Sequence, residues 1–76
     1  MDNYEIVKTI QLEGDFEGFD DEVLFKSIDG SYWIQEQYKY WYHYAYSPKA
    51  HILQANGRLY LRLVGQREVV PIIPIS

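Results

Sequence analysis

Polar and apolar residues alternate along much of this chain, and the clearest alternation lies between positions 38 and 46. Tyrosine occupies every second position there, which is the period of a β-strand and not of a helix. A strand places alternate side chains on opposite faces of its sheet. We therefore expect one face to carry Tyr38, Tyr40, Tyr42, Tyr44 and Tyr46. The other face would carry Lys39, Trp41, His43, Ala45 and Ser47.

Other segments also read as strands, because their apolar residues alternate or lie between strong turn signals. The expected strands are Tyr4–Leu12, Val23–Ile28, Ser31–Tyr46, Ala50–Ala55, Arg58–Val64 and Glu68–Ile73. Lys8 interrupts the apolar set of the first of these strands, which is typical of a strand at the edge of a sheet. Pro71 and Pro74 cannot donate a backbone hydrogen bond, so we expect the last strand at an edge as well.

Two dipeptides predict two-residue hairpin turns, since both favour the positive φ angles that such turns need. Across Asp29-Gly30 the expected pairs are Phe25 with Ile34 and Lys26 with Trp33. Across Asn56-Gly57 they are Ile52 with Leu61 and Ala50 with Leu63. The shared face of the second hairpin is strongly apolar and predicts the core: Ala50, Ile52, Leu59, Leu61 and Leu63.

The segments before and after the first turn are less regular. Glu13–Glu22 contains two glycines and many acids, which predicts a loop whose Phe16 and Phe19 anchor it to the core. The segment from 31 to 46 is too long for one strand of a small domain. We expect it to bend at Gln35-Glu36-Gln37, so that each half serves a different sheet, and to end at Ser47-Pro48.

No stretch of useful length has helical periodicity, and short strands joined by tight turns predict an all-β fold. We expect one domain over residues 1–76, built as a small five- to six-stranded antiparallel barrel, SH3-like or a close variant. A chain of this length buries only about 60% of the surface that it exposes when unfolded, so the core is thin.

The direction in which the tyrosines point depends on the turn at Ser47-Pro48. An odd number of loop residues would place Tyr42 and Tyr44 with the core, and an even number would place Trp41 there instead. Five buried hydroxyls would each need a hydrogen-bond partner, at a cost of about 1–3 kcal/mol for each one left without. We therefore expect most of the tyrosines to be exposed, although a purely structural ladder of cross-strand pairs is an equal alternative.

The composition limits the cellular location and the class of partner that we expect for this protein. The chain has no cysteine, shows no basic and apolar start after Met1, and has no apolar segment long enough to span a membrane. We therefore expect a cytoplasmic protein. The formal net charge of −4 argues against a protein that follows a phosphate backbone, but not against one that binds a basic partner.

The sequence contains only weak candidates for catalytic or metal-binding sites. The serines lie outside any nucleophile motif: Ser27, Ser31, Ser47 and Ser76. One odd-loop register would set His43 across from His51 beside Arg62, but no third metal ligand is evident. The acids of the expected loop do not have the spacing of a calcium-binding loop: Asp15, Glu17, Asp20, Asp21 and Glu22. We expect no catalytic residue, no metal and no cofactor.

The loop Gly14-Asp15-Phe16-Glu17-Gly18-Phe19-Asp20 is followed by Asp29-Gly30, Trp33, Gln35 and the tyrosine alternation up to Pro48. Together these features resemble a group of short, uncharacterised bacterial all-β proteins and modules. The resemblance covers roughly residues 4–70. It implies a bacterial intracellular all-β domain and no particular activity.

These observations predict a non-enzymatic interaction module that binds another protein, or a second copy of itself, through an aromatic sheet face. The expected binding residues are Tyr38, Tyr40, Tyr42, Tyr44, Tyr46 and Trp41. The apolar segment Val69–Ile75 is a second reason to expect a homodimer. The alternative is a single-stranded nucleic-acid binder that stacks bases on the same tyrosines. Its positive rim would be Lys39, Lys49, Arg58, Arg62 and Arg67.

Overall fold

The computed structural model describes residues 3–75, and within that range all regular structure is antiparallel β-strand. Met1, Asp2 and the candidate serine Ser76 lie outside the described residues. In chain order the strands are β1 (Glu5–Gln11), β2 (Asp15–Phe19), β3 (Leu24–Lys26), β4 (Tyr32–Gln35), β5 (Trp41–Tyr46), β6 (Lys49–Ala55), β7 (Arg58–Leu63) and β8 (Val70–Ile75). The all-β prediction is therefore confirmed.

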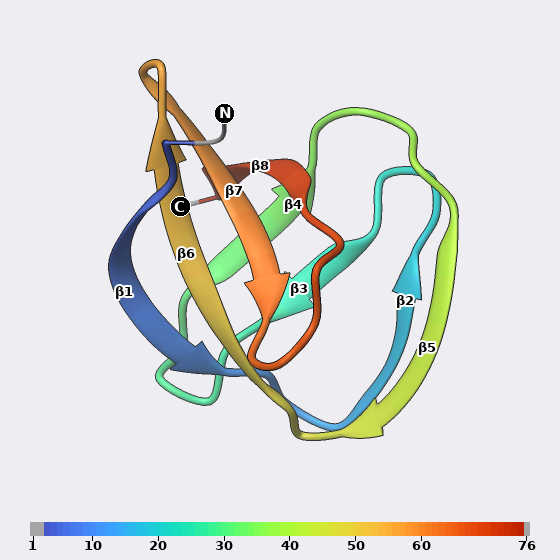
Figure 1. The fold of residues 1–76 in the computed structure, drawn as a ribbon. Coiled ribbons are helices and arrows are strands. Elements are labelled where there is room, and N and C mark those ends of the chain that lie inside the picture. The colour runs from blue at the N-terminus through green and yellow to red at the C-terminus, as the bar shows by residue number, and fades with distance from the viewer. Residues whose placement is uncertain (1–2, 76) are drawn as a thin grey trace.

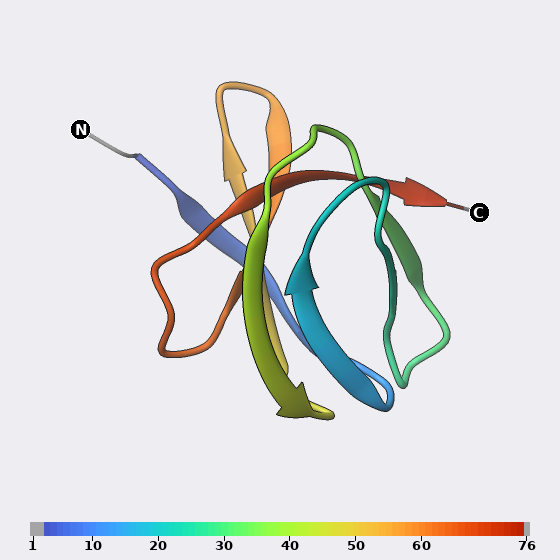
Figure 2. The same cartoon turned by 90° about the vertical axis from the view of Figure 1, so that its right-hand side faces the viewer.

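The strands form two sheets. Six of them lie in the order β1-β6-β7-β8-β4-β3, while β2 pairs with β5 in a separate ribbon on the other side of the core (Figures 1 and 2). Strand β1 is an edge strand, as Lys8 predicts. The two edges of the six-stranded sheet meet only at an isolated bridge between Leu12 and Ser27, where Glu13 N donates to Lys26 O at 2.8 Å. No continuous ladder closes the sheet, so a closed barrel is not found.

The β6–β7 hairpin has the predicted register. Ala55 and Arg58 flank the two-residue turn, and Ile52 lies opposite Leu61. The core cluster gathers side chains from both sheets: Ile10, Leu12, Phe16, Phe19, Phe25, Trp33, Ala50, Ile52, Leu61, Leu63, Val70 and Ile72. Leu59 is partly buried against this cluster, so the apolar face predicted for this hairpin is the core face.

The expected loop at Glu13–Glu22 is wrong, because its middle forms strand β2. The two phenylalanines are buried as predicted, and Phe16 and Phe19 pair with Ala45 and Trp41 of β5. Gly18 permits this pairing, since a Cβ there would lie 1.8 Å from the carbonyl oxygen of Trp41, and its φ is +105°. Acids and glycines suggest a loop here. In the structure the acids occupy exposed positions of a strand, and a glycine occupies its crowded position.

The predicted register across Asp29-Gly30 is wrong by one residue. Phe25 lies opposite Trp33, and the connection has three residues, with Ser27 N bonded to Ser31 O and Gly30 at φ +93°. A glycine with positive φ at the end of a three-residue loop is a common hairpin geometry. The Asp29 carboxylate accepts from the backbone N–H and the hydroxyl of Ser31, and these bonds hold its pKa well below its usual range.

The predicted edge position of the last strand is also wrong, because β8 lies between β7 and β4. Pro71 accepts a hydrogen bond from Glu36 N through its carbonyl, one residue beyond the end of β4. The N and O of a strand residue point to the same side, so the missing N–H of Pro71 faces a place where β4 has already ended. By the same alternation the nitrogen of Pro74 faces β7 beyond its start at Arg58. Each proline therefore costs the sheet no strand-to-strand hydrogen bond.

The long segment from 31 to 46 divides as predicted. Its first half is β4 in the six-stranded sheet, and its second half is β5 in the ribbon. The chain between them, residues 36–40, is irregular, so Tyr38 and Tyr40 precede the strand instead of belonging to it.

Candidate functional site

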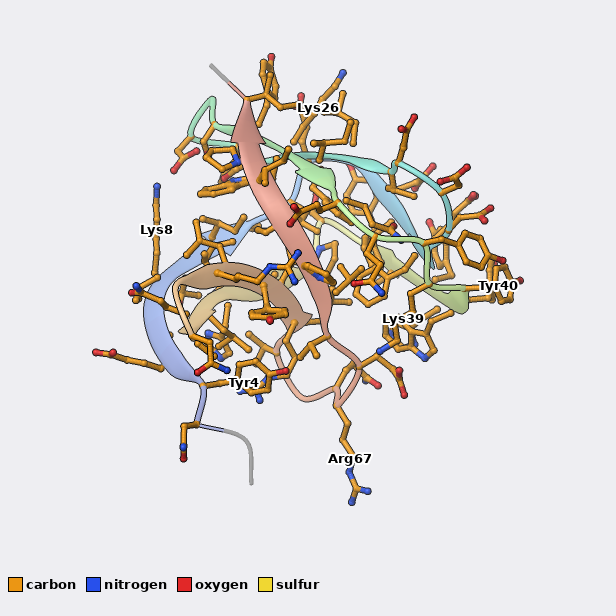
Figure 3. All side chains as sticks on the ribbon, turned by 90° about the horizontal axis from the view of Figure 1, so that it is seen from above. Tyr4, Lys8, Lys26, Lys39, Tyr40 and Arg67 are labelled. Carbon is orange, nitrogen blue, oxygen red and sulfur yellow. The ribbon has the colours of Figure 1, made fainter. Side chains whose placement is uncertain are left out.

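All five predicted tyrosines are on the surface, and we call them the tyrosine face: Tyr38, Tyr40, Tyr42, Tyr44 and Tyr46. Their side chains are between 52% and 72% exposed. Those at 42, 44 and 46 point outward from β5, in strict alternation with half-buried neighbours. Figure 3 shows Tyr40 at the periphery of the molecule, on the side where β2 and β5 lie.

The inner face of β5 carries the other predicted binding residue. Trp41 is half-buried and packs on Phe19, with ring centroids 5.1 Å apart, and on Phe16 at 6.5 Å. His43 stacks on Trp41 with parallel rings 5.1 Å apart. Trp41 therefore packs on the inner side of the strand whose outer side carries part of the tyrosine face. Ser47-Pro48 has two residues, and the orientation is the one expected for an even loop, although β5 pairs with β2 and not with β6.

Gln35 positions the loop that carries the first two tyrosines. Its side chain is 2% exposed, and its amide oxygen accepts from Asp20 N at 3.1 Å. The amide nitrogen donates to the carbonyl oxygens of Asp20 and Gln37, and more distantly to that of Lys39. The end of β4, the end of β2 and the 36–40 loop are thus joined by one side chain. Sequence reasoning located a bend here but gave no signal that this glutamine is buried.

The outer face of β2 brings carboxylates beside the tyrosines. Tyr44 Oη donates to Asp15 Oδ1 at 2.8 Å across the ribbon. This hydrogen bond to a carboxylate raises the pKa of the Tyr44 phenol above its ordinary value, with smaller effects from desolvation and from the charge of Asp15. Asp15 and Glu17 are both exposed, so the aromatic surface has an acidic border on this side.

Residues 13–22, here called the acidic segment, hold six acids and no base. Within residues 3–75 the ion pairs are Lys8–Asp29, Lys39–Glu68 and Arg58–Glu36, and none of them includes an acid of this segment. Lys39 lies within the loop that carries Tyr38 and Tyr40. Its ammonium group is held by Glu68 at 3.0 Å and by the carbonyl oxygen of Val69 at 2.8 Å. The negative charge beside the tyrosine face is therefore uncompensated by ion pairing.

The histidines, acids and serines considered as candidate catalytic or metal-binding residues do not come together in the described part of the structure. His51 bonds to Thr9 and lies opposite Arg62, while His43 stacks on Trp41, so the two histidines are not paired across strands. Over the described range no three residues among His, Cys, Asp and Glu gather as metal ligands. The described serines bond to turn residues: Ser27 accepts from Asp29 N and Ser31 donates to Asp29 within one turn, and Ser47 accepts from Gly14 N of another connection.

In comparisons with known proteins, no protein family, curated protein or solved structure matches this chain. Residues 3–75 contain no helix that is long and apolar enough to cross a membrane.

Proposed function

We propose that this protein is a non-enzymatic interaction module that binds another protein through the tyrosine face. The exposure of all five tyrosines carries the proposal. Tyrosine offers a large contact area with only two rotatable side-chain bonds and one polar group, and it is enriched at binding hot spots. A structural ladder of cross-strand aromatic pairs would need its rings to pack against aromatic neighbours. Among the ring contacts of the described residues, none involves a tyrosine of this face.

The acidic segment favours a protein partner over nucleic acid. A strand of nucleic acid stacked on the tyrosines would bring its phosphates close to Asp15 and Glu17. Two of the cations expected to form a positive rim, Lys39 and Arg58, are already in ion pairs with Glu68 and Glu36. Phosphate binding requires net positive charge at the contact, so the nucleic-acid alternative has no support from this surface.

Self-association is a second form of the same proposal, and a different surface supports it. The outer faces of β3, β4 and β8 align apolar side chains, with Leu24 opposite Ile34 and Ile34 opposite Ile73. Tyr32 and Ile75 form the next pair, and both are exposed. We call this set the aliphatic face: Leu24, Tyr32, Ile34, Ile73 and Ile75. A contiguous apolar surface of this kind is typical of an interface.

We also propose the finer expectations drawn from the sequence. The isolated bridge between Leu12 and Ser27, just beyond the ends of β1 and β3, supports an incompletely closed, SH3-like barrel. A bacterial origin and a cytoplasmic location are proposed from the resemblance of the sequence and from the lack of cysteine.

The experiment is affinity capture from an extract of the cells that make the protein. The test variant is Tyr42→Ser with Tyr44→Ser, and the matched control is Tyr32→Ser, an exposed strand tyrosine on the aliphatic face. We expect proteins that the wild type and the control retain and the test variant loses. Capture of the same proteins by all three, or of no protein at all, would contradict binding through the tyrosine face.

A further inference from the structure

A pocket of about 420 Å³ lies between β2 and β3, two neighbouring strands that do not pair with each other. Figure 2 shows the chain leaving β2, turning through residues 20–23 and running back into β3. The volume is within the range of about 300–1,000 Å³ that is usual for ligand sites. Tyr40 and Tyr42 line the pocket, so it is continuous with the tyrosine face.

The base of this pocket is aromatic. Phe16, Phe19 and Phe25 line it, and each of their ring centroids lies about 6.1–6.2 Å from the other two. Val23 and Leu24 add aliphatic surface on the β3 side, and Leu24 is 47% exposed. An apolar side chain that entered here would be removed from water, at a gain of roughly 25 cal/mol for each Å² of apolar surface buried.

The rim of the pocket is strongly acidic. Four carboxylates line it, and none belongs to an ion pair within the described chain: Glu13, Asp15, Glu17 and Asp20. Lys26 is the single base in the lining, and Figure 3 shows it far from Tyr40. An occupant with positive charge therefore gains from the carboxylates, and from the tyrosine rings through cation–π contacts.

The strand edges that border the pocket favour an extended occupant. β2 is paired only on its β5 side. β3 is paired with β4, and on its other side the bond from Glu13 N to Lys26 O occupies one end of the edge. Unpaired edges present backbone N–H and C=O groups to an incoming chain, and a peptide that adds as a strand uses them. A nucleic acid lacks this backbone pattern and carries the wrong charge.

From these four features we infer that the pocket between β2 and β3 is a docking site for an extended basic segment of a partner protein. An apolar side chain of that segment enters the pocket over the phenylalanines, and flanking Arg or Lys residues contact the acidic rim. This inference rests on the proposed function and names the class of partner for it.

The test uses a library of random dodecapeptides displayed on phage, selected against the wild-type protein. We expect the enriched sequences to combine Arg or Lys with a bulky apolar residue. The rim variant is Glu17→Gln with Asp20→Asn. Its matched control is Asp21→Asn with Glu22→Gln, which removes the same charge from the acidic segment outside the pocket. The rim variant should weaken a selected peptide by about fivefold at low salt, and the control should leave affinity unchanged.

Three outcomes would overturn the docking site: no enrichment, enrichment of acidic or uncharged sequences, or equal effects of the two double variants. A third variant, Tyr44→Ser with Tyr46→Ser, changes tyrosines that do not line the pocket. Peptides that depend on these tyrosines and not on the rim would leave the proposed function standing while the docking site fails. Peptides that depend on neither would contradict both.

Discussion

At the scale of single residues, Gly18 decides whether the ribbon that carries the tyrosine face can form. Its Cα lies so close to β5 that a Cβ would overlap the Trp41 carbonyl oxygen at 1.8 Å. That oxygen belongs to the backbone, so relief requires the whole strand to move. The pairing register also shifts between Phe16 and Gly18, which shows where β2 adapts to β5.

Replacing Gly18 by alanine should therefore lower the free energy of unfolding by about 3 kcal/mol. Gly14→Ala is the control, because Gly14 also has a positive φ of +75° but has no atom within 4 Å of its Cβ position. It should cost only about 1 kcal/mol, for backbone strain. Urea denaturation measures both values. Equal losses in the two variants would show that the close approach to Trp41 is unimportant.

The hydrogen bond from Tyr44 to Asp15 gives a prediction on pH. A raised phenol pKa means that folding favours the protonated tyrosine. This contribution to stability is fully present below the unfolded pKa of about 10 and is lost as the pH rises through the higher folded pKa. The variant Asp15→Asn should lower the Tyr44 pKa toward its ordinary value. The ¹³Cζ chemical shift of Tyr44 followed against pH measures it, and an unchanged pKa would rule out this cause.

At the scale of the elements, the loop between β4 and β5 has its shape because Gln35 is buried. One side-chain amide bonds to backbone groups of β2's end and of the 36–40 loop. An apolar side chain of similar size would leave the Asp20 N–H and several carbonyl oxygens without this partner. A buried polar group without a partner costs about 1–3 kcal/mol.

The variant Gln35→Leu should accordingly lose about 2 kcal/mol of stability. Faster amide hydrogen exchange at Asp20 should accompany the loss, because Asp20 N donates to the Gln35 side chain. Gln37→Leu is the matched control, since the side chain at 37 is exposed, and it should change stability by no more than about 0.5 kcal/mol. Protection of the Asp20 amide that is the same in both variants would contradict the role assigned to Gln35.

At the scale of the whole molecule, two surfaces that adjoin at Leu24 are available for association. The tyrosine face and its acidic pocket lie on β2, β3 and the chain from 38 to 46, while the aliphatic face lies on the outside of β3, β4 and β8. The five residues of the aliphatic face are uncharged, and Lys26 borders them opposite Tyr32, so the apolar centre fits a second copy of itself about a twofold axis. The tyrosine face has an acidic border that repels its own copy.

Homodimerisation is therefore predicted to use the aliphatic face. Ile73→Lys should shift sedimentation from dimer toward monomer at a given concentration, because a charge at the centre of an apolar interface is costly to bury. Val64→Lys is the control, an equally exposed aliphatic residue that follows β7. A wild type that sediments as a monomer at high concentration would remove the prediction, and so would a dimer that both variants preserve.

The sequence by itself determined the features that depend on local period and turn chemistry. The β6–β7 register follows from Asn56-Gly57, and the outward direction of Tyr42, Tyr44 and Tyr46 follows from strand alternation together with the need to keep their hydroxyls hydrated. Tyr38 and Tyr40 are exposed too, but they lie in irregular chain that strand alternation does not describe. Only the tertiary structure decided which strands become neighbours. It made β2 a strand through contact with β5, and it placed β8 between two strands in a register where each proline faces the end of a neighbour. The pocket and the bonds of Gln35 arise in the same way. They join residues distant in the chain, and no local pattern records such contacts.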